Sequence, residues 1–184
     1  MKPEQHPNQP TGRAKSTRSM GHLMLLLAFA LLLGMVTWFM QGRLDALYNP
    51  NQNLSASSTE DGQAIHLERN RYGHYVASGT INDVPVVFLL DTGATHVSVP
   101  ATIAERIGLR AGRAQRVNTA NGSIQVYSTI LDSVRLGPLE LRDVRGGINP
   151  HMEGNEVLLG MSFLKHLNWS QCGGILTLSQ RDTH

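Results

Sequence analysis

The chain has 184 residues but only one cysteine, Cys172. A single cysteine excludes an intramolecular disulfide framework, a four-cysteine zinc site and a Cys-x-x-Cys redox centre. The eight histidines include no His-Glu-x-x-His motif and no His-x-His pair, so we expect no metal site. Gly146-Gly147 precedes no helix of the kind that binds phosphate, and we expect no cofactor.

Motifs that mark a serine or cysteine nucleophile are missing as well. No Gly-x-Ser-x-Gly sequence occurs, and Cys172 stands in a glycine-rich turn without an adjacent histidine. Both observations argue against catalysis by a hydroxyl or thiol nucleophile.

The chain also lacks a strong excess of charge of one sign. Its formal net charge is +2, from 16 basic and 14 acidic residues. Four of the basic residues lie in the polar N-terminal tail: Lys2, Arg13, Lys15 and Arg18. Membrane topology explains such a tail better than a nucleic-acid partner does, so we expect no nucleic-acid binding.

One long hydrophobic run is present, Leu23 to Met40, without a single charge. At about 1.5 Å per helical residue it spans roughly the hydrocarbon thickness of a bilayer. A cleaved signal peptide is the alternative, since Ala28-Phe29-Ala30 fits a small-x-small site, but only five apolar residues precede that site. A buried core helix would show amphipathic periodicity, which is missing. We expect an uncleaved membrane anchor with the basic tail in the cytoplasm and the rest of the chain outside.

These patterns predict four segments. The linker contains Asn, Ser, Pro, Gly and Gln with few large apolar residues, a composition that cannot bury enough surface to order itself. The segments are a cytoplasmic basic tail (1–22), a transmembrane helix (23–40), a flexible linker (41–63) and one folded domain (64–184).

The domain carries short apolar runs separated by Gly, Asn and Pro, a pattern typical of a mainly β fold. Asn82-Asp83 and Asn121-Gly122 indicate hairpin turns, because these residues tolerate positive φ. Short helices are predicted at Pro100–Ile107 and Ser162–Leu167. The predicted strands are 74–81, 84–90, 96–99, 123–131, 139–144, 157–159 and 175–178.

One tetrad in the domain stands out, Asp91-Thr92-Gly93-Ala94, which directly follows the apolar strand Val86–Leu90. A carboxylate at the end of a buried strand indicates a specific role for that residue, because burying it unpaired costs several kcal/mol. Gly93 allows a tight turn, and Thr92 supplies a hydroxyl. Two copies of this turn, related by a two-fold axis, would bring two carboxyls together so that they share one proton and activate a water.

At these residues the sequence resembles the retropepsin-like aspartic proteases, in particular their single-domain, membrane-anchored bacterial members. The resemblance extends to the Asn121-Gly122 hairpin and to Val157-Leu158-Leu159-Gly160 followed by Phe163-Leu164, and covers roughly residues 64–180. It implies a closed β-barrel half-domain of the acid protease fold with one or two short helices. It also implies a bacterial inner-membrane protein whose domain faces the periplasm.

The resemblance implies roles for the tetrad. Asp91 would be the catalytic residue, and Thr92 would bond across a dimer axis to its twin. Gly93 and Ala94 would complete the active-site turn. Thr95 stands where some relatives have an acid, and His96 follows it, so substrate specificity does not carry over.

Two further groups of residues take their roles from the resemblance. Residues 119–125 would form a flap over the substrate. The flap residues are Thr119, Ala120, Asn121, Gly122 and Ser123. The hydrophobic-glycine element consists of Leu158, Leu159 and Gly160. Tyr127, near the flap, would either line the cleft or pack as an ordinary β aromatic.

The chain contains one Asp-Thr-Gly and no second copy, since Asp132-Ser133 and Asp182-Thr183 are followed by other residues. An enzyme built on this motif must therefore be a homodimer acting on a peptide or protein substrate. In the family, terminal strands build part of the dimer interface, which makes Ile175–Leu178 the candidate; an edge strand within one subunit is the alternative. The sequence predicts a membrane-anchored aspartic endopeptidase. The alternative is a catalytically silent peptide-binding or scaffolding module of the same fold.

Overall fold

The computed structural model describes residues 15–59, 62–119 and 122–180, and the side chains of 20–57, 63–118 and 122–180. The chain divides into two units, Met1–Leu44 and Asp45–His184. Each unit is described by itself below.

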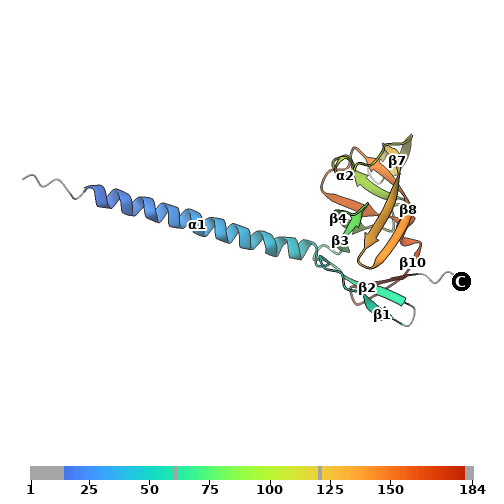
Figure 1. Ribbon diagram of the computed structural model, residues 1–184, viewed down its shortest axis with the longest axis horizontal. Helices are drawn as coiled ribbons and strands as arrows, with labels where there is room; N and C mark the ends of the chain where they lie inside the picture. The colour runs from blue at the N-terminus through green and yellow to red at the C-terminus, as the bar shows by residue number, and fades with distance from the viewer. Residues whose placement is uncertain (1–14, 60–61, 120–121, 181–184) are drawn as a thin grey trace, which may run out of the picture. The chain divides into compact units, whose positions relative to one another are not determined.

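The first unit consists mainly of helix α1 (Lys15–Tyr48), drawn in blue in Figure 1, which continues into the second unit. Its part from Met20 to Tyr48 has a mean hydropathy of 2.4 in its most apolar window, none of which is buried. The predicted apolar run 23–40 lies inside this helix. Its length and composition suit a membrane anchor or a signal sequence.

The structure differs from the predicted flexible linker over much of 41–63. Helix α1 continues to Tyr48, and Asn49 and Asn51 are buried. The Asn51 side chain donates to the carbonyls of Glu68 (2.9 Å) and Val76 (2.7 Å) and accepts from the Glu68 N–H (2.7 Å). A polar side chain of this kind can form the hydrogen bonds that backbone groups of distant strands need. The composition of the segment does not reveal such bonds. The second unit accordingly begins at Asp45, well before residue 64.

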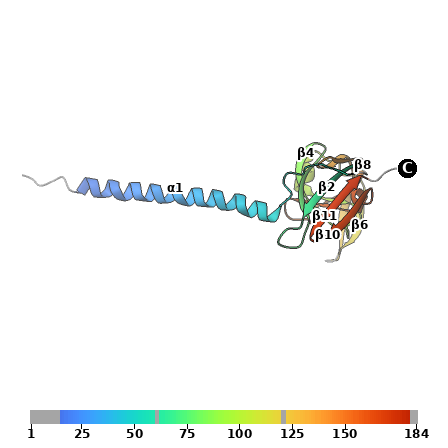
Figure 2. The ribbon, with the colours of Figure 1, turned by 90° about the horizontal axis from the view of Figure 1, so that it is seen from below.

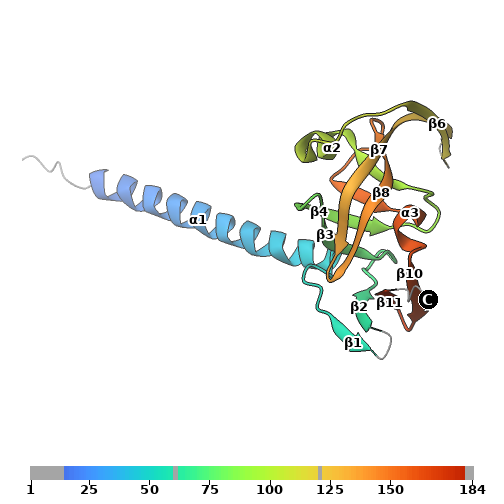
Figure 3. The same ribbon diagram turned by 45° about the vertical axis from the view of Figure 1, so that its right-hand side comes forward.

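Seven strands form the main sheet. They are β3 (Val76–Ile81), β4 (Val84–Leu90), β5 (Val97–Pro100), β6 (Ala114–Thr119), β7 (Gly122–Leu136), β8 (Leu139–Asn149) and β9 (Glu156–Leu159). Their order is β3-β4-β9-β5-β8-β7-β6, and an additional pairing of β3 with β7 closes six of them into a barrel. Strand β6 pairs only with β7, outside the barrel (Figure 3). The predicted mainly β, closed-barrel fold is confirmed.

A second sheet is formed by β1 (Ser57–Thr59), β2 (Gly62–Glu68), β10 (Leu167–Cys172) and β11 (Ile175–Gln180), in the order β1-β2-β11-β10. Figure 2 shows β2, β11 and β10 side by side. Of the two predictions for Ile175–Leu178, the edge strand is wrong, because β11 pairs with β2 on one side and with β10 on the other. The sequence could not show this, because β2 lies more than a hundred residues earlier. A place in a dimer interface stays a prediction.

The predicted turns and helices are largely confirmed. Asn82 (φ 49°) and Asp83 (φ 62°) form the turn between β3 and β4. Helix α2 (Ala101–Ile107) ends at Gly108 in the left-handed conformation. Helix α3 (Met161–Leu164) is shorter than predicted, because Leu167 already belongs to β10.

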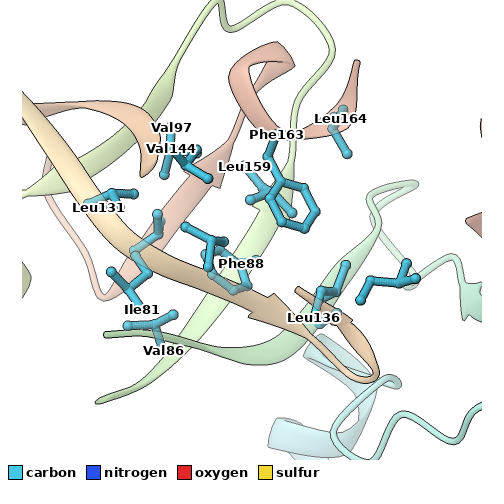
Figure 4. Packing of buried hydrophobic residues seen from close by; sticks show 14 of the residues in the cluster. Ile81, Val86, Phe88, Val97, Leu131, Leu136, Val144, Leu159, Phe163 and Leu164 are labelled. Carbon is cyan, nitrogen blue, oxygen red and sulfur yellow. The ribbon is translucent and has the colours of Figure 1, made fainter. Parts of the chain in front are cut away.

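The barrel interior is filled by aliphatic and aromatic side chains from several strands and from α3 (Figure 4). Phe88 of β4, Leu159 of β9 and Phe163 of α3 are fully buried. Burying a side chain of this size contributes about 1.5–3 kcal/mol. Since Leu159 and Phe163 stand on either side of Gly160, this packing fixes the backbone at Gly160.

Candidate active site

Asp91 is the first residue after β4, at the end where β4 runs parallel to β9. Its N–H donates to the Leu159 carbonyl (3.2 Å), which continues the ladder between the two strands. Its carboxylate Oδ1 accepts the Gly93 N–H (2.8 Å), and the Ala94 N–H donates to the Asp91 carbonyl (3.2 Å). The carboxylate is therefore held by its own turn and is partly exposed.

A side chain at Gly93 would crowd this turn. A Cβ at this position would lie 3.1 Å from the Asp91 Oδ1 that the Gly93 N–H contacts. Thr92 and Gly93 are both exposed, whereas Ala94 is partly buried. The predicted turn residues therefore lie together around the carboxylate, with one carboxylate oxygen held by the backbone.

Helix α3 supports the turn from behind. The Met161 N–H donates to the Ala94 carbonyl (2.8 Å), and the Ser162 N–H donates to the Thr95 carbonyl (2.9 Å). Gly160 makes this approach possible, because an added Cβ would lie 2.4 Å from the carbonyl oxygen of His96 and 2.6 Å from that of Ala94. The predicted hydrophobic-glycine element, Leu158, Leu159 and Gly160, thus lies directly against the predicted active-site turn.

Ser162 is a residue that the sequence reasoning missed. Its hydroxyl donates to the Arg145 carbonyl of β8 (2.7 Å) and accepts the N–H of Val97 (3.0 Å), where the turn enters β5. A single side chain thereby joins the exit of the turn, α3 and β8. The available signal was a hydroxyl residue at the start of a predicted helix, and nothing local identifies its partners 17 and 65 residues away.

Ser162→Ala is expected to destabilise the domain by about 1–3 kcal/mol, because it leaves the N–H of buried Val97 without its partner. Ser162→Thr, which keeps a hydroxyl, should retain the stability of the wild type. Denaturant unfolding checks these variants, with Ser98→Ala as the control serine. Equal free energies of unfolding for Ser162→Ala and the wild type would contradict this role of the hydroxyl.

The predicted flap corresponds to the hairpin of β6 and β7. Thr119 pairs with Gly122, which is the first residue of β7 and thus belongs to the strand, whereas the sequence predicts it at the tip. Ala120 and Asn121 lie outside the described residues. The Ser123 hydroxyl donates to the Asn118 side chain (2.6 Å). An open hollow of about 290 Å³ lies along the hairpin, lined by Ala114, Gln115, Arg116, Ser123, Ile124 and Gln125.

Other side chains near the site are placed as follows. Tyr127 is half-buried against the hydrophobic core, which favours the prediction of a packed aromatic. Thr95 and His96 are exposed.

Within the described ranges, no group of three His, Cys, Asp or Glu residues is arranged to hold a metal ion. Asp91 takes part in no salt bridge in that part of the chain.

Comparison with known proteins places these residues in a family context. Residues 77–166 match the sequence profile of the family described as "gag-polyprotein putative aspartyl protease". This stretch contains the Asp91 turn, the β6–β7 hairpin, Gly160 and Ser162.

Similar proteins include the following three. An uncharacterized protein from the cobV 5′ region of Sinorhizobium sp. is 30% identical over 132 residues, covering 70% of this chain and 57% of its own. The uncharacterized protein RP867 of Rickettsia prowazekii is 30% identical over 112 residues, covering 59% of this chain and 47% of its own. The chain thus spans about half the length of these relatives.

The third is a crystal structure, that of a retropepsin-like aspartic protease from Rickettsia conorii. It superposes with a TM-score of 0.55 at 26% identity, covering 68% of this chain and 94% of that one.

Proposed function

We propose that this chain, which belongs to the retropepsin-like aspartyl protease family, is an aspartic endopeptidase whose site is completed by a second copy of itself. The observation that carries the proposal is the Asp91 turn. Its carboxylate is partly exposed, held by the Gly93 N–H and braced from behind by α3. The substrate would be a peptide or protein, and the chemistry needs no cofactor.

In the proposed mechanism the two Asp91 carboxyls share one proton, because two like charges at contact distance do not both ionise readily. The ionised carboxyl takes a proton from a water as the water oxygen attacks the peptide carbonyl carbon. The protonated carboxyl donates to the carbonyl oxygen, and the roles reverse when the amine leaves. The N–H of Gly93 fixes Oδ1, which leaves Oδ2 for the water and the substrate.

Neighbouring residues take supporting roles in the proposal. Thr92, which is exposed, hydrogen-bonds across the dimer axis to its counterpart. The hairpin residues 119–125 cover the bound substrate. Gly160 and Ser162 hold the active-site turn in the position in which the two Asp91 carboxyls can meet.

We further propose that α1 anchors the enzyme in a bacterial inner membrane, with residues 1–22 in the cytoplasm and the protease unit in the periplasm. Support comes from the apolar stretch of α1, none of which is buried, and from the basic residues that precede it. Confinement to a membrane raises the effective concentration of partners, which favours a dimer that each chain needs in order to act.

The function can be tested by the pH dependence of cleavage. The full chain in detergent micelles should cleave an unfolded protein, and kcat/KM should follow a bell-shaped curve, because the paired carboxyls must together hold one proton. Degradation is measured from acidic to neutral pH. A folded, dimeric chain that cleaves nothing at any pH would contradict the proposal and favour the silent peptide-binding module.

A further inference from the structure

The loop between β2 and β3, residues 69–75, presents cationic and aromatic side chains to the solvent. Arg69 and Arg71 are exposed, and Tyr72 is 61% exposed. Each arginine lies over a tyrosine ring, Arg69 over Tyr75 (5.5 Å to the ring centroid) and Arg71 over Tyr72 (5.3 Å). Neither arginine takes part in a salt bridge in the described part of the chain. Two guanidinium groups beside exposed tyrosine form a combination that suits a membrane–water interface.

The loop is held in one conformation by the side chain of Asn70, which is buried. Its amide oxygen accepts the N–H groups of Tyr72 (2.9 Å) and His74 (3.0 Å), and its amide nitrogen donates to the carbonyl of Tyr48 (3.0 Å). The rings of Tyr48 and Tyr72 are also in contact, with their centroids 6.4 Å apart. The loop is therefore preformed and is fastened directly to Tyr48, the last residue of α1.

The chain keeps this loop close to the apolar run of α1. Tyr48 follows Met40, the last residue of that run, by eight positions. Eight residues of helix span about 12 Å, and even a fully extended chain of that length reaches no more than about 30 Å. A bilayer that holds the apolar run therefore has its surface within reach of the loop.

The charge of the loop is complementary to that of a phospholipid surface. No acidic residue occurs between Glu68 and Asp83, so the charged residues of this stretch are the two arginines. Glu68 adjoins the loop at the end of β2 and leaves the segment 68–75 with a net positive charge. A guanidinium group can bind a phosphate through two parallel hydrogen bonds. Anionic lipids attract each arginine near their surface further.

We propose that the loop 69–75 docks on the phospholipid headgroups of the bilayer that holds α1, with a preference for anionic headgroups. This inference rests on the proposed membrane anchor. Arg69 and Arg71 bind headgroup phosphates, and Tyr72 lies at the level of the headgroups. The protease unit thereby has a second attachment and one orientation on the membrane. Two copies with the same orientation lose less rotational freedom when they pair.

A fluorescent label in the loop tests the docking on the full chain in lipid vesicles. His74→Cys combined with Cys172→Ser gives one exposed labelling site, since Cys172 is the only native cysteine. The vesicles contain a small proportion of lipid with a nitroxide on its headgroup, which quenches only nearby labels. We expect strong quenching in phosphatidylglycerol mixed with phosphatidylcholine, weak quenching in phosphatidylcholine alone, and a loss of the difference at high salt because of screening.

A second labelling site serves as the control for position. Asp132 is exposed and accepts a hydrogen bond from Asn82, which follows the far end of β3. Six residues of strand separate Val76 from Asn82, about 20 Å. A label at Asp132→Cys, again with Cys172→Ser, should be quenched much less than the label in the loop. Equal quenching at the two positions would contradict docking through the loop.

The double variant Arg69→Gln/Arg71→Gln removes the charges on which the proposal depends. We expect the equilibrium constant for docking, measured from the quenching, to fall about 30-fold. Arg110→Gln/Arg113→Gln is the matched control, because it removes two other exposed arginines and changes the net charge equally. Its docking should match that of the wild type, and circular dichroism checks that both variants are folded. The lipid and salt dependence of the chain with native arginines decides the matter if the first variant does not fold.

The outcomes for docking and for the anchor are separate. Alkaline carbonate extraction of the same vesicles tests the anchor, and neither readout depends on cleavage. A chain that is extracted, yet whose quenching depends on Arg69 and Arg71, would refute the anchor and leave the docking in place. A chain that resists extraction, with quenching that is the same in both lipid mixtures or unchanged in Arg69→Gln/Arg71→Gln, would overturn the docking and leave the anchor in place.

Discussion

Asp91→Asn is expected to lower kcat for peptide cleavage by about 10²–10⁴-fold, the usual range for losing a general acid–base group. Asparagine has almost the same shape and keeps an oxygen that can accept the Gly93 N–H. It can neither take a proton from water nor donate one to a peptide carbonyl at ordinary pH. The fold should therefore persist while the chemistry stops. Cleavage of an unfolded protein and thermal unfolding are measured on the same full-length preparation.

Asp132→Asn is the matched control for this experiment. Asp132 is also followed by a hydroxyl residue, Ser133, but not by glycine, and it lies on β7, where its carboxylate accepts from the Asn82 side chain. The same chemical change at this position should leave cleavage unaltered. If Asp91→Asn cleaved as fast as Asp132→Asn, the catalytic role of Asp91 would be refuted.

Gly160→Ala should have the second-largest effect. The new Cβ would meet two backbone carbonyl oxygens, those of His96 (2.4 Å) and Ala94 (2.6 Å), and neither belongs to a side chain that can swing away. Overpacking of this kind costs about 1–3 kcal/mol. Because the displaced segment is the active-site turn, a shift of about 1 Å should also lower kcat by roughly 10²-fold.

Gly79→Ala separates the two parts of that effect. Its Cβ would be equally crowded, 2.4 Å from the Arg135 carbonyl oxygen and 2.6 Å from the Phe88 ring, but it lies on β3, which carries none of the site residues. We expect it to lose comparable stability while kcat per folded molecule is kept. Chemical denaturation and active-site-normalised kinetics on both variants make the comparison. Equal losses of kcat would mean that Gly160 acts through stability alone.

The parts of the fold that the sequence predicts depend on local patterns. The strand that ends at Leu90 is an uninterrupted apolar run, Asn82-Asp83 suits a tight turn, and Gly108 ends a helix in the left-handed conformation. The Asp91 turn was predicted from the same kind of evidence, an acid followed by glycine after an apolar strand. In each case neighbouring residues determine the conformation.

The parts that were missed depend on contacts between distant residues. Asn51 belongs to a stretch of linker-like composition, yet it is buried because Glu68 and Val76 offer backbone groups to its side chain. The role of Ser162 likewise follows from distant residues, because its hydroxyl bonds to Val97 and Arg145 only once the fold brings them together. The position of β11 inside the second sheet likewise depends on its pairing with β2 and β10.

The central claim is that two copies of this chain share one catalytic site. It is tested most directly by mixing wild-type and Asp91→Asn chains at constant total concentration under conditions of subunit exchange. If each site needs two Asp91 carboxyls, activity follows the square of the wild-type fraction, so an equal mixture retains about a quarter of the full rate, as random two-fold pairing requires. An equal mixture that retained half of the rate would show that each chain works alone, and would contradict the account.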